Sequence, residues 1–244
     1  TIVRMLSTME NRQIKTLLYE QVARIGKAVA SPKRLELLDL LGQCEKTVEA
    51  IARDAGLSVK LASAHLKELK SARLVETRRQ GKYIIYRLAD RSVSEFWVAL
   101  RSLAEERLLE AQTALSEFLS EPEKLAPADR RAILEGARRG DIVVIDVRPD
   151  EEYRAGHLPF ARSIPLAELK KKLASLPRGK RIVAYCRGPF CMMSKEAVAL
   201  LRKKGYRAAR LPDGVAEWNA AGLPVEAGMA GKNQAGAGSP QRPG

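Results

Sequence analysis

The sequence predicts two domains, a mainly α domain followed by an α/β domain with a parallel sheet. In the first half, amphipathic segments with helix-capping residues lead into one pair of alternating apolar and polar segments. In the second half, short apolar runs alternate with amphipathic segments, which is typical of a parallel sheet with helical crossovers. The length of 244 residues accommodates two ordinary domains.

The first two helices are predicted from periodicity and from their end signals. Residues 10–29 have the apolar spacing of an amphipathic helix. The next segment, SPKRLELLDLLG, has Ser31 as its N-cap and Pro32 in the first helical position, and Gly42 is expected to close it.

Two more helices and a hairpin follow. TVEAIARDAG is a short helix with Thr47 as its cap and Gly56 as its terminator, and residues 57–75 form another helix capped by Ser58. VETRRQGKYIIYRLAD, residues 75–90, alternates in polarity on both sides of a basic turn, which predicts a β-hairpin.

Residues 92–120 predict one long helix with an apolar stripe. A small domain cannot bury a stripe of that length by itself. We therefore expect this helix to pack against a second copy of the chain.

The elements of the second half alternate between strand and helix. The predicted strands are DIVVIDVR (141–148), RIVAYC (181–186) and YRAARL (206–211), and the predicted helices are PLAELKKKLASL (165–176) and MSKEAVALLRKKG (193–205). The strands are continuously apolar, so both faces of the sheet should be covered.

These patterns define the predicted boundaries. The first domain covers residues 10–120, and a linker rich in proline and charge covers residues 121–129. The α/β domain covers residues 130–228. Residues 229–244 are rich in Gly, Pro and polar residues and are expected to be disordered.

The charge indicates a nucleic-acid partner. The formal net charge is +14, and residues 53–91 hold ten Lys and Arg against four Asp and Glu. Helix, turn, helix and basic hairpin is the order of a winged helix-turn-helix, in which one helix reads the major groove and the hairpin contacts the backbone or minor groove. The expected DNA-binding residues are Lys60, Ser63, His65 and Lys67 on the helix and Arg78, Arg79 and Lys82 on the hairpin. The alternative is a solvated basic surface.

SPKRLELLDLLG and LSVKLASAHLKELKSARLVETRRQGKYIIYRL, with their flanking helices, resemble the ArsR/SmtB family of small repressors. The resemblance covers about residues 10–100. It implies a homodimer built on the first and last helices, a palindromic operator in double-stranded DNA, and release of DNA when an inducer is sensed.

The common metal sites of that family are missing. Thr47 and Glu49 stand where the paired cysteines of many members align, and the last helix of the domain has no histidine. Cys44 lies just upstream, and a lone cysteine is more often a packing residue than a ligand. We therefore expect no metal and no cofactor in this domain.

The stretch YCRGPFCMMSKEA places Cys186 where a buried strand meets a helix, with Cys191 five residues further on. Three cysteines do not make a disulfide framework. Zinc needs three or four protein ligands, and only His65 and His157 add to this pair. A buried structural cysteine is a second alternative. The favoured interpretation is a nucleophile whose thiolate is stabilised by the helix start, loop N–H groups and the adjacent Arg187.

VIDVRPDEEYRAGHLPFARSIPL, VAYCRG and LPDGVAEWNAAGLPV resemble a rhodanese domain. The resemblance implies an α/β fold whose loop cysteine carries a persulfide between a sulfur donor and an acceptor. Cys186 takes the nucleophile position, with Arg187 and Gly188 in the loop after it. Asp146 and Arg148 occupy the strand end nearby and, with His157, are expected to support the loop.

Two features depart from the family pattern. Cys191 stands where sulfurtransferases of this type often have Arg or a hydroxyl residue, and Pro189 removes one loop N–H. Both weaken the binding of thiosulfate and argue against the related phosphatases and arsenate reductases. Cys191 is instead a candidate resolving thiol that attacks the Cys186 persulfide and leaves a disulfide or polysulfide bridge.

The sequence thus predicts a cytoplasmic, homodimeric DNA-binding repressor that carries or senses sulfane sulfur at Cys186. A small sulfur donor such as thiosulfate, a polysulfide or a persulfide is the expected partner besides DNA. One alternative is an active thiosulfate-type sulfurtransferase joined to a DNA-binding domain, and the other is an arsenical or soft-metal sensor. No apolar run is long enough for a membrane span, so no membrane partner is expected.

Overall fold

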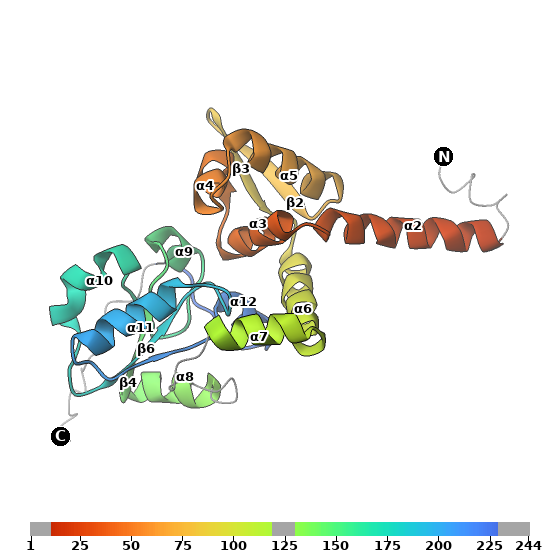
Figure 1. Cartoon of the computed structure of the whole chain (residues 1–244). Coiled ribbons are helices and arrows are strands. Elements are labelled where there is room, and N and C mark those ends of the chain that lie inside the picture. Colours follow the sequence, from red (N-terminus) through yellow and green to blue (C-terminus); the bar gives the residue numbers. More distant parts are fainter. Residues whose placement is uncertain (1–10, 119–129, 229–244) are drawn as a thin grey trace, which may run out of the picture. The chain divides into compact units, whose positions relative to one another are not determined.

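The computed structural model describes residues 11–118 and 130–228 (Figure 1). The predicted linker at 121–129 and the predicted disordered tail at 229–244 lie outside these ranges. Tertiary contacts divide the chain between Gln112 and Thr113, and the two units are described separately.

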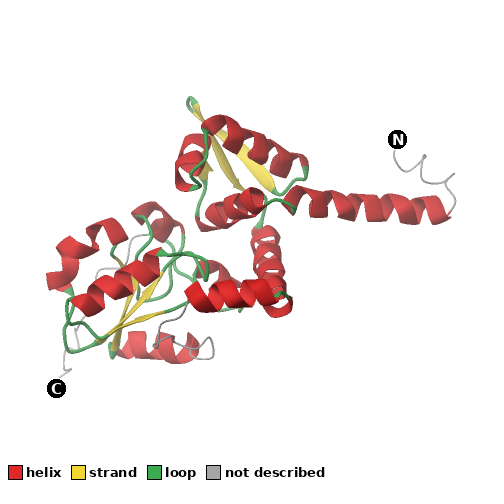
Figure 2. Cartoon of the chain, in the orientation of Figure 1, coloured by secondary structure: helices red, strands yellow, loops and turns green. Residues whose placement is uncertain are grey.

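The N-terminal unit combines helices with a small antiparallel sheet (Figure 2). Its elements are α2 (Asn11–Val29), α3 (Pro32–Gln43), β1 (Lys46–Thr47), α4 (Val48–Asp54), α5 (Val59–Ser71), β2 (Val75–Gln80), β3 (Tyr83–Leu88) and α6 (Arg91–Arg107). The strand order is β1-β3-β2, so β1 adds a short strand that the periodicity did not predict.

The helix signals are confirmed at α4 and α5. The Thr47 hydroxyl accepts a hydrogen bond from the Ala50 amide, and the Ser58 hydroxyl accepts one from the Leu61 amide, both over 3.2 Å. Gly56 has a φ of 62°, a conformation in which glycine avoids the strain of a side chain.

The expected stop at Gly42 is wrong by one residue. Helix α3 continues through Gly42 to Gln43, and Cys44 adopts extended backbone. A glycine ends a helix efficiently when it takes positive φ, and Gly42 remains helical. Ser31 is the N-cap residue, but its side chain makes no capping hydrogen bond.

The core of this unit lies between α3, α4, α5 and α6. Leu37, Ile51, Leu66 and Leu69 are completely buried. The Trp97 indole N–H on α6 donates to an Asp39 carboxylate oxygen on α3 over 2.9 Å, which satisfies its polar atom. These contacts place α5 on the surface with one face in the core and one face exposed.

The single helix predicted for residues 92–120 is interrupted. Leu108 is extended, with φ −104° and ψ 114°, and separates α6 from α7 (Leu109–Phe118). The Leu108 amide donates to the Ala104 carbonyl, and the Leu108 carbonyl accepts from the Gln112 amide. One residue therefore closes one helix and opens the next, in a segment without proline or glycine to mark it. Residues 119 and 120 lie outside the described ranges.

The C-terminal unit contains the predicted parallel sheet. Its order is β5-β4-β6-β7, and every neighbouring pair is parallel. The strands are β4 (Ile142–Asp146), β5 (Arg162–Ser163), β6 (Arg181–Tyr185) and β7 (Ala208–Arg210). The helices are α8 (Arg130–Arg139), α9 (Asp150–Ala155), α10 (Leu166–Lys172) with a 3-10 turn at Leu173–Ser175, α11 (Met193–Lys203) and α12 (Val215–Ala220).

Helices cover both faces of this sheet, as predicted (Figure 1). Successive residues of a strand point to opposite faces. Ile182 and Ala184 of β6 therefore pack in one core with α10 and α11, whereas Val183 and Tyr185 pack in a second core with α8 and α12. This arrangement places the residue after Tyr185 at the carboxyl edge of the sheet.

None of the helices in the described ranges has the length and apolar character to span a membrane.

Candidate functional site

Cys186 lies in the turn between β6 and α11. Its side chain is buried, with 1% of the residue exposed. The thiol donates to the Ser194 hydroxyl oxygen over 3.1 Å and to the Cys191 carbonyl oxygen over 3.5 Å. Cys44, Cys186 and Cys191 form no disulfide with one another. The cysteine thus occupies the strand-to-helix turn that the sequence predicts.

Arg210, the last residue of β7, reaches under this loop. Its Nε donates to Ser194 Oγ over 2.9 Å, and its Nη2 donates to the carbonyl oxygens of Pro189 and Cys191 over 2.8 and 3.2 Å. A longer contact of 3.5 Å joins Nη2 to the Gly188 carbonyl. One buried guanidinium group therefore fixes the loop and the hydroxyl that contacts Cys186.

The two thiols of the loop have opposite acidities. Burial alone raises the pKa of Cys186. When its sulfur is ionised, it accepts hydrogen bonds from the Cys191 thiol and from the Ser194 hydroxyl and amide, and these bonds, together with the charge of Arg210, lower the pKa to about 7. The pKa of Cys191 is raised, because its thiol is hydrogen-bonded to Cys186 and is largely buried. Cys186 is consequently the thiolate of the pair near neutral pH.

Asp146 and Arg148 form a buried ion pair beneath the loop. The Arg148 Nη2 lies 2.6 Å from Asp146 Oδ2, and both side chains are completely buried. The Tyr185 hydroxyl donates to the same carboxylate oxygen over 2.6 Å and accepts from the Leu158 amide over 3.1 Å. Arg148 also donates to the Gly156 carbonyl over 2.7 Å. These residues join the ends of β4 and β6.

His157 belongs to the same supporting structure. Its ring stacks on Tyr153 with centroids 3.8 Å apart, and its Nδ1 lies 2.9 Å from the Tyr153 carbonyl oxygen. Its backbone forms an isolated bridge with Glu226.

The residues directly after Cys186 have separate roles. The Arg187 guanidinium pairs with the buried Glu152 carboxylate over 2.6 Å, so its charge is compensated there. Gly188 has a φ of 143°, which side-chain-bearing residues rarely adopt. Pro189 provides no N–H, and its carbonyl faces Arg210. The loop is therefore stabilised through its carbonyl groups.

Gly214, at the start of α12, lies against the backbone of this loop. A Cβ atom at this position would lie 2.7 Å from the Cys186 oxygen and from the Arg187 carbonyl carbon and oxygen. The Gly214 amide donates to a Glu217 carboxylate oxygen over 2.6 Å, which holds the segment in place. The backbone after β6 therefore fits only against a glycine.

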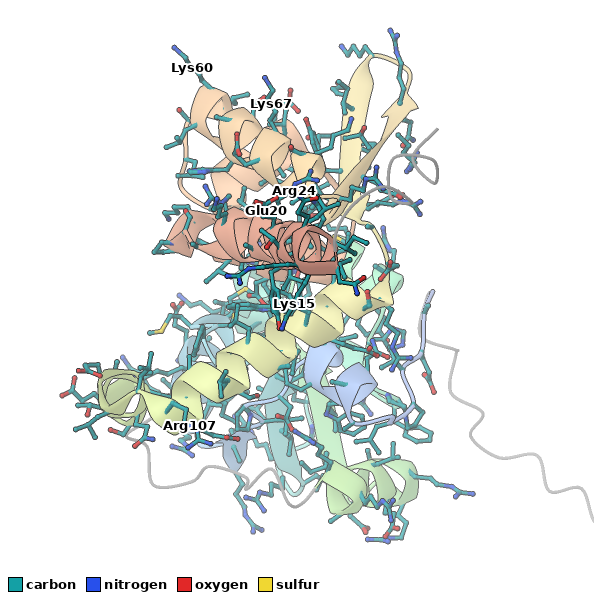
Figure 3. The ribbon with its side chains drawn as sticks, turned by 90° about the vertical axis from the view of Figure 1, so that its right-hand side faces the viewer. Lys15, Glu20, Arg24, Lys60, Lys67 and Arg107 are labelled. Carbon is teal, nitrogen blue, oxygen red and sulfur yellow. The ribbon has the colours of Figure 1, made fainter. Side chains whose placement is uncertain are left out.

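The predicted DNA-reading residues lie on α5. Ala62, Leu66 and Leu69 turn into the core, while Lys60, Ser63 and Lys67 are exposed and His65 is half-buried. The three exposed positions are spaced i, i+3 and i+7, so they share one face of the helix. Figure 3 shows Lys60 and Lys67 projecting from the helix into solvent.

The hairpin residues are exposed but differ in their contacts. Arg78 lies within β2 and forms a bidentate ion pair with Glu45. Arg79 donates to the Gly81 carbonyl over 3.0 Å in the turn, and Lys82 lies 5.3 Å from the centre of the Tyr83 ring. The turn is formed by residues 81 and 82, since Gln80 pairs with Tyr83, so Lys82 is the basic residue at its tip.

Within the two described ranges, no group of three or more His, Cys, Asp or Glu side chains is arranged to hold a metal ion.

Together, a winged helix-turn-helix and a parallel-sheet domain with a cysteine loop define a two-domain regulator. The family model for "Bacterial regulatory protein, arsR family" matches residues 31–77, and the model for "Rhodanese-like domain" matches residues 129–221. The HTH-type transcriptional regulator Rv0324 of Mycobacterium tuberculosis is 45% identical over 214 residues, covering 88% of this chain and 94% of that protein. The chain belongs to the ArsR family of transcriptional regulators and carries a C-terminal rhodanese-like domain.

Each domain also has relatives of its own. The homodimeric winged helix-turn-helix DNA-binding domain of a Mycobacterium bovis protein is 44% identical, with a TM-score of 0.39, and the match covers 42% of this chain and 93% of that chain. A sulfurtransferase of Allochromatium vinosum is 31% identical over 88 residues, which is 36% of this chain and 80% of that protein.

The sequence did not predict three residues that contact the loop after Cys186, namely Ser194, Arg210 and Gly214. Ser194 follows Cys186 by eight positions at the start of a helix, where a hydroxyl can face the loop. Gly214 stands in the quoted LPDGVAEW segment, where a glycine can indicate close backbone approach. Arg210 lies near the end of the predicted strand 206–211, where a charged residue next to apolar ones can indicate a buried functional group.

Residues 186–192, between β6 and α11, are called the sulfur loop below because they contain Cys186 and Cys191. Replacing Gly214 with alanine should disturb this loop, because the added methyl group must displace the Cys186–Arg187 backbone. We expect a loss of about 1–3 kcal/mol in the free energy of unfolding and a several-fold change in the rate of Cys186 alkylation. Urea denaturation and mass-spectrometric alkylation kinetics measure the two effects. Gly179→Ala is the matched control, since no atom lies within 4 Å of its added methyl group. Equal behaviour of the two variants would contradict the close contact.

Proposed function

We propose that the rhodanese-like domain accepts sulfane sulfur at Cys186 and that the sulfur state of this loop changes the affinity of the ArsR domain for operator DNA. The chain then acts as a repressor that responds to reactive sulfur.

The observation that carries this proposal is the contact between two thiols of opposite acidity in one loop. A thiolate is the reactive form of cysteine, and the pKa of Cys186 near 7 provides it at neutral pH. Cys191 keeps its proton at that pH, because its thiol is hydrogen-bonded to Cys186, and is the weaker nucleophile of the two. It can therefore act only on a persulfide already formed at Cys186, and it must pass its proton to the leaving sulfur. The pair therefore combines a nucleophile with a thiol that can resolve its product.

The chemistry balances in two steps. The Cys186 thiolate attacks the sulfane sulfur of a donor such as thiosulfate, which leaves a Cys186 persulfide and releases sulfite. The Cys191 sulfur then attacks the inner sulfur of that persulfide, forms a Cys186–Cys191 disulfide and expels the outer sulfur as hydrosulfide, which carries away the Cys191 proton. The sulfane sulfur is reduced and the two thiols are oxidised, so no additional oxidant is required.

The loop supports sensing better than rapid turnover. Cys186 is only 1% exposed, and the carbonyl groups of Pro189 and Cys191 face the Arg210 guanidinium. That cation is consequently engaged with the protein and is not presented to an incoming oxyanion. A slow reaction that leaves a stable modified state suits a regulator.

Homodimer formation is part of the proposal. On α2, the exposed fractions of Leu18, Tyr19 and Val22 are 62%, 66% and 69%, and Leu103 on α6 is 52% exposed. Apolar faces of this kind on the first and last helices of the ArsR domain suit a contact with a second copy.

The thiolate of Cys186 should depend on Arg210. Alkylation of wild-type protein by iodoacetamide should increase with pH around a midpoint near 7, because deprotonation creates the nucleophile. Arg210→Gln removes the positive charge and the support of Ser194, so the midpoint should move upward toward the value near 8.5 of an ordinary thiol. Arg154→Gln is the matched control, because Arg154 is exposed and is not part of this loop. An unchanged midpoint in the Arg210 variant, or an equal shift in both variants, would refute this role of Arg210.

The regulatory proposal is tested by titrating DNA from the chain's own promoter region with reduced and polysulfide-treated protein. Polysulfide treatment should weaken binding of the wild type by at least about fivefold, the lower end of typical coupling between sites. Cys186→Ser should bind the DNA and fail to respond. Cys191→Ser should accumulate the persulfide, visible by mass spectrometry, without forming the disulfide. Equal affinities in all states would refute the switch.

The alternative function is enzymatic sulfur transfer, which the relative from Allochromatium vinosum favours. Steady-state turnover of thiosulfate with cyanide as acceptor distinguishes the two. We expect slow turnover in the wild type, well below typical enzyme rates of about 10 per second. Rapid turnover that is abolished in Cys186→Ser, with DNA affinity unaffected by sulfur, would establish the enzyme and exclude the sensor.

A further inference from the structure

Part of the rhodanese-like domain is strongly basic. Residues 170–210 contain thirteen Lys and Arg and one acidic residue, Glu196. Arg187 lies in the sulfur loop and Arg210 contacts that loop, which leaves eleven cations elsewhere in this segment. Strands β6 and β7 begin at one edge of the sheet, at Arg181 and Ala208, and helix α11 ends near it at Lys203. Cys186 follows the opposite end of β6. Five strand residues separate the two edges by about 16 Å.

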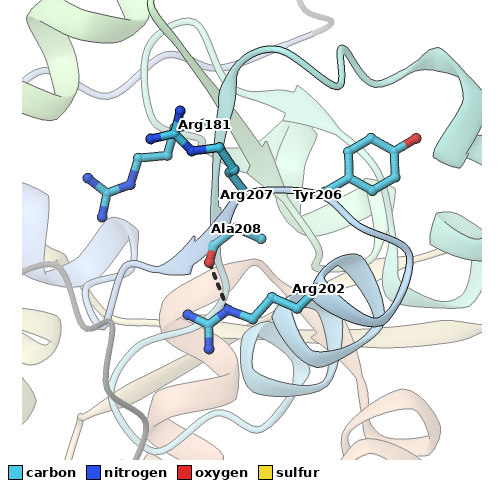
Figure 4. Close-up of a pocket in the computed structure, with 5 residues that line it drawn as sticks. All are labelled: Arg181, Arg202, Tyr206, Arg207 and Ala208. Atoms are coloured by element: carbon cyan, nitrogen blue, oxygen red, sulfur yellow. Dashed lines mark hydrogen bonds between the residues drawn. The ribbon is translucent and has the colours of Figure 1, made fainter.

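At this edge, three arginines and one tyrosine line a cavity of about 560 Å³. Its lining residues are Arg181, Arg202, Tyr206, Arg207 and Ala208 (Figure 4). Figure 4 shows the three arginine side chains ending on the same side of the view, away from the Tyr206 ring. We call this cavity the arginine pocket.

Part of the arginine pocket is held in a fixed arrangement. Arg202 Nε donates to the Ala208 carbonyl over 3.0 Å, and the Tyr206 hydroxyl donates to the Leu173 carbonyl over 2.6 Å. Arg178 lies 5.0 Å from the centre of the Tyr206 ring and donates to the Lys204 carbonyl over 3.3 Å. These contacts account structurally for Arg178 and Arg202, because cations near a helix C-terminus stabilise its carbonyl end.

Arg181 and Arg207 have no such structural role. Both are exposed, and among the described residues neither forms an ion pair with a carboxylate. Together with Arg202 they place three guanidinium groups around one cavity, where a bound anion would reduce the repulsion between them. Guanidinium groups match the geometry of phosphate oxygens and form bidentate hydrogen bonds with them.

We propose that the arginine pocket binds a backbone phosphate of the same DNA molecule that the winged helix-turn-helix domain binds. DNA is the polyanion that an ArsR-family regulator already holds, and a phosphate contact needs no base sequence. The rhodanese-like domain then adds affinity without adding sequence specificity. This phosphate contact is independent of the sulfur chemistry at Cys186.

The test compares two double variants of the full chain that remove the same formal charge. Arg181→Gln with Arg207→Gln alters the pocket. Arg154→Gln with Arg162→Gln alters exposed arginines elsewhere in the domain. Binding to a duplex of about 60 base pairs is measured over a range of salt concentrations, since each neutralised phosphate contributes a slope of about −0.9 to log K against log salt.

The pocket variant should bind about eightfold more weakly at 0.1 M salt for each phosphate that it no longer neutralises, and the slope should fall by about one per phosphate. The control should keep the wild-type slope. Unchanged Cys186 alkylation in both variants shows that the domain remains folded. Equal weakening in both variants, or a wild-type slope in the pocket variant, would overturn the proposal.

Calorimetry with inorganic phosphate distinguishes a small ligand from DNA. If the pocket variant no longer binds phosphate but keeps its duplex affinity and slope, the pocket belongs to a small phosphate-bearing molecule and the DNA contact is overturned. The two proposals can fail separately. If sulfur treatment does not change DNA affinity but the pocket variant still shows a reduced salt slope, the DNA contact is supported and the sulfur switch is not.

Discussion

The buried ion pair between Asp146 and Arg148 is the constraint on which the rhodanese-like domain depends. Two charges without solvent are tolerated only when hydrogen bonds satisfy their remaining atoms, and here the Tyr185 hydroxyl and the Gly156 carbonyl do so. Burial and the Asp146 carboxylate raise the pKa of Tyr185 well above its usual value, so its hydroxyl remains a proton donor. Because Tyr185 precedes Cys186 directly, this network fixes the backbone position from which the sulfur loop begins.

A single cation, the Arg210 guanidinium, holds the sulfur loop in place through hydrogen bonds. Arg210 holds the carbonyl groups of Pro189 and Cys191 and the Ser194 hydroxyl, and that hydroxyl contacts Cys186. In many anion-binding loops the backbone N–H groups face the ligand. Here the carbonyl groups face an internal guanidinium instead, so the protein itself supplies the charge that the thiolate needs. The arrangement favours a stabilised sulfur anion over repeated binding of an external oxyanion.

Local signals predicted most of the fold and the position of Cys186 in the turn between β6 and α11. The caps at Thr47 and Ser58 act within four residues of sequence, and the apolar runs of β4 and β6 follow from burial on both faces, so both are visible without coordinates. The pairing of Arg187 with Glu152 could not be predicted in this way, because the two residues are 35 positions apart and only the fold brings them together. Arg210 was missed for the same reason. The break at Leu108 carries no composition signal, since leucine is a good helix former and its neighbours are as well.

The contact at Gly214 has a mechanical consequence. The Cα of this residue lies against the Cys186–Arg187 backbone with no space for a methyl group, and its amide is tied to Glu217 in the first turn of α12. Because no space separates the Gly214 backbone from the Cys186–Arg187 backbone, the two segments are expected to move together. A movement of the backbone that follows Cys186 would therefore require Gly214 to move as well, and Gly214 is the N-cap of α12, which carries the buried Trp218. The absence of a side chain at Gly214 therefore couples the backbone position after Cys186 to the position of α12.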